Sequence, residues 1–430
     1  MPDYKKKKVS RFGVHTKPPK NRAPMKDSHD EIKMHQSRKP LENVTDTGRF
    51  RVVKGKKLEK KQHLKIAAAA LTVFVAAYGL LTWLLPVNLH ENIGNVLHTF
   101  GSGEYPIELS GSETVSSDMR NGYYYTLTDT SLYAFTNGGK QIYKSLHGYS
   151  APVLKTSETR ALVFDQGGGS LAVYNLSRKV NSISDEKVHI ITAAISRSGV
   201  YAVAAKTDNY ASTVTVYDRK GKEIYVWNSA KDTVNSVAVS PSGKKLAVST
   251  VNANAGSCVA KVMVFSFDSA DPTASFDIAD APVYSLENLG RGFMVLTSEG
   301  GSFVDWSKYR KSDIKNESEM DMFRRGNGAA VMVFNRSSDR SDNKVLLVSQ
   351  NGEKQTEFGF KGVISDIEYS GGHIYIISDT AVYSYSKKGE LLQSGECDYG
   401  CKRFAVISAD KLAVMIDNRI TTSVLQKEEK

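Results

Sequence analysis

The sequence predicts an all-β protein: a β-propeller of about eight four-stranded blades, preceded by one transmembrane helix and a disordered basic tail. Three observations support this prediction. Short strands with alternating apolar residues recur from residue 105 onward, with a period of about 40 residues that is typical of propeller blades. A long uncharged run precedes them, and the excess of basic residues lies before that run. We therefore expect four segments: a tail (1–62), a transmembrane helix (63–87), a stalk (88–104) and a propeller (105–427).

The N-terminal segment, residues 1–62, is predicted to be a disordered cytoplasmic tail. Residues 1–65 contain 20 Lys/Arg and 7 Asp/Glu, a net charge of +13, whereas the whole chain carries +11. The net charge is therefore a property of the tail. Because the tail has few aromatic residues and no recognisable fold, we expect no nucleic acid as a partner. The basic cluster at 54–65 can bind anionic lipid headgroups. The alternative is that this cluster acts only as a topology signal.

The run at 66–87 predicts a membrane-spanning helix. It contains 22 residues without a charge, which span roughly 33 Å as a helix and match the hydrocarbon core of a bilayer. Lysines crowd its N-terminal side, and residues 88–104 contain no Lys or Arg. The N-terminus is therefore expected in the cytoplasm and the C-terminal domain outside, in a single-pass protein of the cell membrane. A cleaved signal peptide is the competing interpretation, but its apolar core would be shorter and closer to the N-terminus.

The stalk, residues 88–104, carries apolar residues at helical spacing from Leu89 to Phe100. This spacing predicts a brief amphipathic helix that ends at Gly101 and Gly103.

From Tyr105 onward the apolar period changes to that of β-strands. The clearest repeat is 189–229, which reads as four strands separated by turns, and repeats begin near residues 113, 151, 188, 232, 281, 316, 361 and 399. The last repeat offers only three strands. Placing 105–110 as its outer strand closes the ring with both ends of the domain and gives eight blades. Seven blades remain an alternative, with 305–330 as an insertion, and stacked β-sandwich domains are a second one that explains the period less well.

Two stretches, VAVSPSGKKLAVST (237–250) and TVTVYDRKGKEI (213–224), resemble bacterial WD-like and YVTN-type propeller repeats. The Trp-Asp and Gly-His pairs of the WD family are missing, and so is the tandem Trp motif of quinone-dependent propellers. The layout of basic tail, single span and propeller resembles an uncharacterised family of single-pass surface proteins of Gram-positive bacteria. That resemblance implies the fold and the topology, and it implies no activity.

No motif in the propeller predicts a catalytic, cofactor-binding or metal-binding site, and we expect none. His147, His189 and His373 lie outside any known catalytic pattern. The glycines at 167–169 precede a strand, which favours a hairpin turn over a phosphate loop. Asp339 and Asp342 could contribute to a calcium loop, but the rest of the ligand pattern is lacking, so a solvated turn is the default interpretation.

The three cysteines, Cys258, Cys397 and Cys401, cannot all pair within one chain. Cys397 and Cys401 could close a small disulfide loop, with two reduced thiols as the alternative. Four-residue spacing without a nearby histidine is a weak zinc signal.

Carboxylates that belong to separate blades could still meet in a propeller, as acid–base chemistry on glycans would require. Residues near the ends of inner strands would supply them, and the examples are Asp165, Asp208, Glu287 and Asp366. The sequence assigns none of them to a site.

Taken together, the patterns favour a non-catalytic, membrane-anchored propeller that acts as an extracytoplasmic binding platform, scaffold or sensor in the cell envelope. Its expected ligand is another envelope protein or a glycan. The alternative is a surface enzyme that acts on carbohydrate or peptide at an axial active site.

Overall fold

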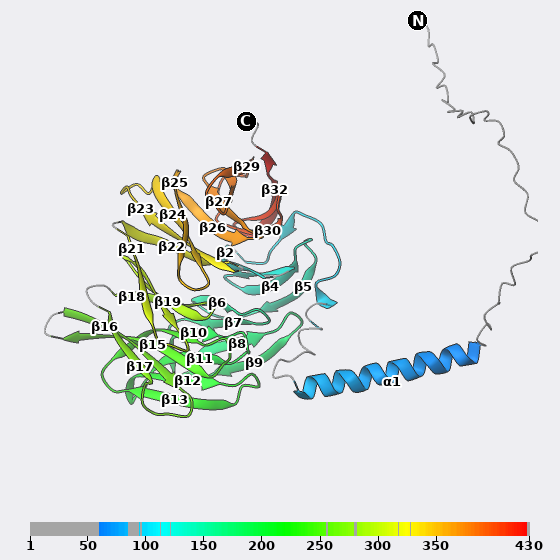
Figure 1. The fold of residues 1–430 in the computed structure, drawn as a ribbon, viewed down its shortest axis with the longest axis horizontal. Helices are drawn as coiled ribbons and strands as arrows, with labels where there is room; N and C mark the ends of the chain where they lie inside the picture. Colours follow the sequence, from blue (N-terminus) through cyan, green and yellow to red (C-terminus); the bar gives the residue numbers. More distant parts are fainter. Residues whose placement is uncertain are drawn as a thin grey trace, which may run out of the picture. The chain divides into compact units, whose positions relative to one another are not determined.

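The computed structural model describes residues 60–84, 94, 97–111, 113–120, 122–254, 257–278, 282–316, 318–326 and 328–427. Residues 1–59 of the tail and residues 88–93, 95 and 96 of the stalk lie outside these residues. The propeller follows the stalk as a ring of eight antiparallel sheets (Figure 1). The predicted eight-bladed fold is therefore confirmed. The region 305–330, which could have been an insertion, contributes regular strands to the fifth and sixth blades.

The strands fall into blades as follows. Blade 1 contains β2 (Thr114–Arg120), β3 (Tyr123–Thr128), β4 (Ser131–Thr136) and β5 (Gln141–Leu146). Blade 2 contains β6 (Pro152–Thr156), β7 (Ala161–Asp165), β8 (Ser170–Tyr174) and β9 (Lys179–Ser184). Blade 3 contains β10 (His189–Ile195), β11 (Tyr201–Thr207), β12 (Tyr210–Tyr217) and β13 (Glu223–Ser229). Blade 4 contains β14 (Thr233–Val239), β15 (Lys245–Asn254), β16 (Ser257–Ser266) and β17 (Ala274–Ile278). Blade 5 contains β18 (Val283–Leu289), β19 (Gly292–Thr297), β20 (Gly300–Asp305) and β21 (Lys311–Lys315). Blade 6 contains β22 (Glu319–Arg325), β23 (Ala329–Asn335), β24 (Asp342–Ser349) and β25 (Lys354–Lys361). Blade 7 contains β26 (Ile364–Ser370), β27 (His373–Ser378), β28 (Ala381–Ser386), β29 (Leu391–Glu396) and the added β33 (Gln426–Lys427), and blade 8 contains β30 (Arg403–Ser408), β31 (Lys411–Ile416), β32 (Arg419–Val424) and β1 (Ile107–Glu108).

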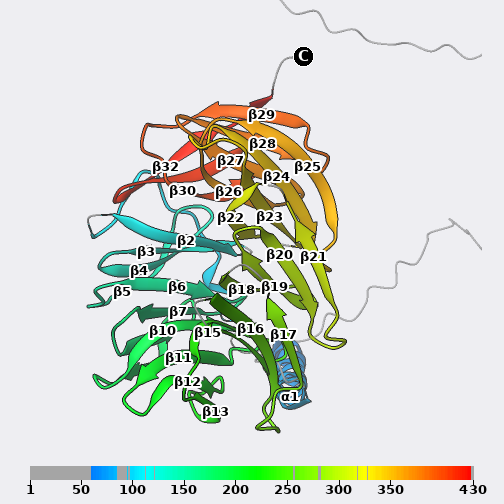
Figure 2. The same ribbon diagram turned by 90° about the vertical axis from the view of Figure 1, so that its left-hand side faces the viewer.

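Both ends of the domain close the ring. Strand β1 pairs with β32, so that Ile107 lies opposite Ile420, and it completes blade 8 as its outer strand. This confirms the position expected for 105–110. Figures 1 and 2 show the last strands of the chain, in red, beside the first blade, in cyan. Strand β33 then pairs with β29 and covers the outer edge of blade 7.

The hydrophobic core consists of eight clusters, one at each junction between neighbouring blades. The cluster that joins blades 8 and 1 contains Leu109, Tyr124, Phe135, Ala413 and Met415. The second and third strands of most blades are buried on both faces, so their apolar residues run nearly without interruption, whereas the outer strands alternate between partly buried and exposed residues.

Near the start of the inner strand, six blades carry a shift in the register with the second strand. In blade 4, for example, the shift lies between Val234 and Ser236 and leaves Asn235 without a paired residue. Such β-bulges re-aim a side chain and increase the local twist.

Helix α1 spans Lys60–Leu84 and is 25 residues long. Its described side chains, at 64–80, include large apolar residues that are exposed, such as Leu71, Val73 and Phe74. The expected span at 63–87 extends beyond these described side chains. Among the residues that the structure describes, no helix combines the length and the apolar character needed to cross a membrane.

Ring closure generates a stability prediction. Deleting 105–110 should lower the free energy of unfolding by about 3–5 kcal/mol, because it removes the buried Leu109 and leaves the edge of β32 unpaired. Deleting 426–430 is the matched control: β33 is short and exposed, so its loss should cost about 1 kcal/mol or less. Denaturant unfolding of the full-length proteins measures both effects. Equal stability of the two deletions would show that the ring closes in another way.

Candidate functional site

The two faces of the ring differ in which turns they carry. We call "stalk face" the face with the turn between the first and second strands and the turn between the third and fourth strands of each blade. The chain also enters the propeller there, because the Gly103 amide donates to the Gly138 carbonyl at 2.9 Å in the β4–β5 turn. The "distal face" carries the turns between second and third strands and the loops between blades.

A funnel opens on the stalk face at the axis of the ring. It has a volume of about 1070 Å³, and every blade contributes its first turn or the residues beside it. One lining residue from each blade, in chain order, is Gly122, Glu158, Arg197, Pro241, Gly290, Gly326, Gly371 and Ala409. Several of the turns are glycine-rich, which keeps side chains out of the funnel mouth. The wall carries Arg291 and Arg325 in addition to a surface ion pair between Arg197 and Glu158, at 2.7 Å.

Charged side chains of the inner strands form a network around the channel. Lys155 Nζ in β6 lies 3.0 Å from Glu287 Oε1 in β18, and this ion pair joins blades 2 and 5. Arg324 Nε in β22 lies 3.0 Å from Asp366 Oδ1 in β26. On β2, Asp118 accepts a hydrogen bond from the Thr156 hydroxyl of the next blade. The network thus connects inner strands from five of the eight blades.

Glu287 is held as a carboxylate in this network. Burial raises its pKa, but the ammonium of Lys155 and the guanidinium groups of Arg325 and Arg324 outweigh that effect, so the pKa lies below its ordinary value. Asp366 is buried and bonded to Arg324. Arg324 therefore interacts with both carboxylates and links them in one charged group.

The structure separates the four carboxylates that the sequence offered as candidates. Glu287 and Asp366 are linked through Arg324, which pairs with Asp366 and acts electrostatically on Glu287. Asp165 lies at the end of β7 and accepts the Ala151 amide at 2.8 Å, and Asp208 is exposed in the β11–β12 turn on the distal face. Sequence analysis did not single out Lys155 and Arg324. Each of these two basic residues lies within a short inner strand, and this unusual position is the only sign of its role in the sequence. The sequence does not show which carboxylate each one pairs with.

The histidines and the glycine run form local contacts. His147 contacts the Thr128 carbonyl, His189 the Gly167 carbonyl and His373 the Tyr375 hydroxyl. Residues 166–169 form the β7–β8 turn, as the hairpin interpretation predicted. Within the described part of the chain, no group of three or more His, Cys, Asp or Glu side chains is arranged to hold a metal ion.

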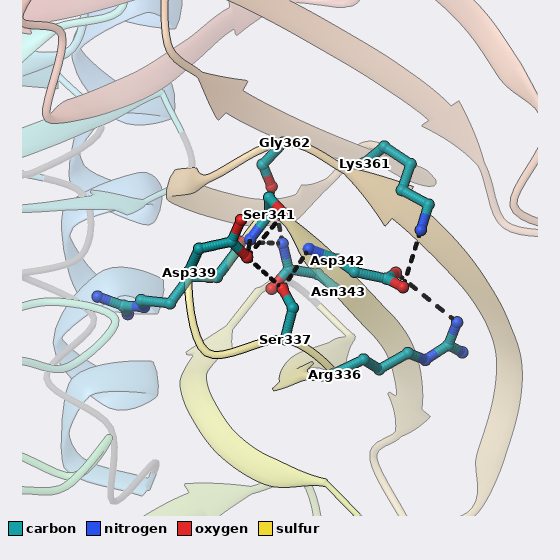
Figure 3. Close-up of polar contacts among 9 residues, drawn as sticks. Arg336, Ser337, Asp339, Ser341, Asp342, Asn343, Lys361 and Gly362 are labelled. Atoms are coloured by element: carbon teal, nitrogen blue, oxygen red, sulfur yellow. Dashed lines mark hydrogen bonds and ion pairs between the residues drawn. The ribbon is translucent and has the colours of Figure 1, made fainter.

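The loop with Asp339 and Asp342 is an internally bonded turn (Figure 3). Asp339 Oδ1 accepts the Ser337 hydroxyl at 2.6 Å and the Ser341 hydroxyl at 2.8 Å, and these bonds lower the pKa of Asp339 to about 2. Asp342 faces away from Asp339 and pairs with Lys361 at 2.8 Å. The two carboxylates therefore bind separate partners, with Asp339 in the turn and Asp342 at the start of β24.

Cys397 and Cys401 are free thiols in the loop between blades 7 and 8. Cys401 is buried and Cys397 half-buried. The interaction of the two thiols lowers the pKa of Cys397 and raises that of Cys401, and burial adds to the rise at Cys401. The S–H of Cys401 donates to the Asp398 carbonyl at 2.8 Å. The reduced-thiol alternative is therefore the state seen here. The side chain of Cys258 lies outside the described residues.

The two faces carry opposite charge. Among the described residues in its turns, the stalk face has thirteen basic and seven acidic side chains: Lys140, Arg160, Arg178, Arg197, Arg219, Lys220, Lys222, Lys244, Arg291, Lys308, Arg310, Lys387 and Lys388, against Glu158, Asp218, Asp268, Asp271, Glu353, Glu390 and Asp410. On the same basis the distal face has five basic and eleven acidic side chains: Lys187, Lys231, Arg336, Arg340 and Lys402, against Glu113, Asp129, Asp185, Glu186, Asp208, Asp232, Glu299, Asp339, Asp379, Asp398 and Asp417. The propeller is therefore a dipolar ring whose funnel opens on the basic side.

Comparison with known proteins supports the fold. A family of unknown function, DUF5711, matches residues 102–425. The computationally designed Ika8 protein is similar with a TM-score of 0.51 and 13% identity, over 75% of this chain and 98% of that one. The C-terminal WD40 domain of Sif2 is similar with a TM-score of 0.51 and 12% identity, over 76% of this chain and 100% of that one. At such identities the likeness shows the fold alone. No curated protein sequence matches the chain.

The charge network generates a pH-dependent prediction. Because the pKa of Glu287 is lowered in the folded state, its stabilising contribution is present above the unfolded pKa of about 4.3 and is lost as the pH falls through the folded value. Glu287→Gln should therefore reduce the free energy of unfolding at pH 7 by about 1–3 kcal/mol, and the difference from wild type should shrink toward pH 3.

Urea unfolding at pH 7, 5, 4 and 3 measures this difference. Glu299→Gln, in an exposed turn on the distal face, is the matched control and should leave stability within about 0.5 kcal/mol of wild type. A Glu287→Gln difference that stays constant down to pH 3 would contradict the assigned role of the carboxylate.

Proposed function

We propose that this chain, which belongs to the DUF5711 family of unknown function, is a non-catalytic binding platform or scaffold attached to a membrane. The axial funnel carries this proposal. It is large enough for a peptide segment or a sugar chain, and all eight blades line it with turns. A surface assembled from every blade offers many independent positions for recognition while the buried ring beneath stays rigid.

The charge network favours binding over catalysis. Glycoside hydrolysis needs one carboxyl group with a raised pKa as the acid and a second carboxylate as base or nucleophile. The pKa of Glu287 is lowered instead, and Asp366 is paired with Arg324. The enzyme alternative would have to use other residues or break both ion pairs on binding. We therefore propose that the protein is not an enzyme.

Membrane attachment is supported by the sequence and by the exposed apolar surface of α1. Residues 66–87 contain no charge, and the large side chains described on this helix, such as Ile66, Val75 and Leu80, are exposed. An uncovered apolar helix of this kind is stable when lipid or another protein surrounds it. The lysines before it orient the N-terminus to the cytoplasm. We propose an envelope protein or a glycan as the ligand of the propeller.

The orientation is tested with a membrane-impermeant protease. On intact cells the protease should remove a tag fused after Lys430 and spare a tag fused before Met1, because the propeller would lie outside and the tail inside. Immunoblotting of both tags measures the result, and lysed cells, in which both tags should be cut, provide the control. Protection of the C-terminal tag together with loss of the N-terminal tag would reverse the proposed topology.

The funnel is tested by site-specific photo-crosslinking in cells. A photoreactive residue at Glu158 or at Arg291, on two different blades of the funnel wall, should capture the same partner, whereas one at Glu299 on the distal face should not. Arg291→Glu should reduce the yield from position 158 at least threefold. Capture of the same partner from all three positions would contradict recognition at the funnel. Glycan or peptide cleavage that Glu287→Gln abolishes would establish the enzyme alternative.

A further inference from the structure

We propose that the stalk face of the propeller rests on the anionic phospholipid surface of the membrane that holds the chain, with the acidic distal face directed away. This inference relies on the proposed membrane attachment. It concerns residues of the propeller itself and is separate from the basic cluster of the tail.

The first observation is the fixed junction between stalk and propeller. The Gly103 amide donates to the Gly138 carbonyl, Lys140 Nζ donates to the Phe100 carbonyl at 3.0 Å, and the Thr136 hydroxyl donates to the Gly101 carbonyl at 3.3 Å. The backbones approach so closely that a Cβ at Gly103 would collide with the Gly139 carbonyl. Residues 100–103 are thus held against the β4–β5 turn, and the chain leaves the propeller from the stalk face.

The second observation is the length of the tether. Helix α1 ends at Leu84, and the fixed segment begins at Phe100. The fifteen residues between them make sixteen Cα–Cα steps, which reach at most about 55 Å when fully extended and about 24 Å as a helix. Because the tether is fixed at the stalk face, a compact tether favours contact of that face with the membrane surface.

The third observation is the charge near the junction. Exposed basic residues follow one another on the third turns of blades 1 to 3: Lys140, Arg178, Lys220 and Lys222. Clusters of this kind bind anionic headgroups, and each charge adds to the attraction within a Debye length. Leu97 and Phe100, which are 64% and 65% exposed, lie at the end of the tether and suit the boundary between headgroups and acyl chains.

The proposal has a consequence for the funnel, since the funnel opens on the same face. A ligand that enters it would come from the membrane side, for example as an extracytoplasmic segment of a membrane protein. The turns of the distal face, with their acidic excess, would be repelled from the same surface, so both faces favour one orientation.

The test uses the full-length chain reconstituted in vesicles of phosphatidylcholine, with or without 30% phosphatidylglycerol, that carry a headgroup-linked acceptor dye. A fluorescent residue is placed at Ser177 on the stalk face or at Thr130 on the distal face, both exposed turn positions. We expect stronger energy transfer from 177 than from 130, an increase of at least twofold with phosphatidylglycerol, and loss of that increase in 0.5 M NaCl.

Lys220→Glu combined with Lys222→Glu should abolish the increase, whereas Lys187→Glu combined with Lys231→Glu, on the distal face, should leave it unchanged. Flotation of the same vesicles in 1 M NaCl reports attachment separately. A chain that fails to float refutes the membrane attachment, while a chain that floats without a lipid-dependent increase refutes only the resting orientation. Response to a soluble polyanion such as dextran sulfate, without response to phosphatidylglycerol, would likewise overturn it and assign the basic face to a soluble polymer.

Discussion

The whole structure depends on closure of the ring, because every hydrophobic cluster is shared by two blades. No sheet holds a core of its own: the second and third strands of each blade are buried on one side against the preceding blade and on the other against the following one. An open ring would expose both half-cores at the gap. The pairing of β1 with β32 prevents this, and β33 covers the next edge.

Closure also explains why charged residues are tolerated around the axis. Eight inner strands converge there, and their charged side chains lose part of their water, which is costly unless partners are present. No blade can supply those partners alone. Lys155 forms an ion pair with Glu287 three blades away, and Arg324 forms one with Asp366 on the neighbouring blade. The same convergence places eight short turns in a circle at one end of the channel and forms the funnel. The funnel and the charge network are therefore two results of the same geometry.

Much of the fold could be predicted from local patterns. The repeat of about 40 residues, the strand alternation and the three-stranded last repeat together indicated eight blades closed by 105–110. The site could not be predicted in the same way. Glu287 and Lys155 are 132 residues apart in sequence, and their meeting depends on the angle between blades, which no local pattern encodes. The bulge at Asn235 lies in an otherwise regular strand. The charge difference between the faces becomes visible only when each turn is assigned to a face.

The pairing of Ile107 with Ile420 has a consequence for how the protein is made. The two residues that close the ring are separated by nearly the whole domain, and contacts of such long sequence separation form slowly. During synthesis β1 emerges first and has no strand to pair with until β32 follows. Until blade 8 forms, the side of blade 1 that packs against it stays exposed to solvent. A chain that stops before β32 keeps exposed apolar surface and open strand edges, the features that chaperones and proteases recognise in incomplete proteins. Ring closure thus couples the survival of the protein to completion of its last blade.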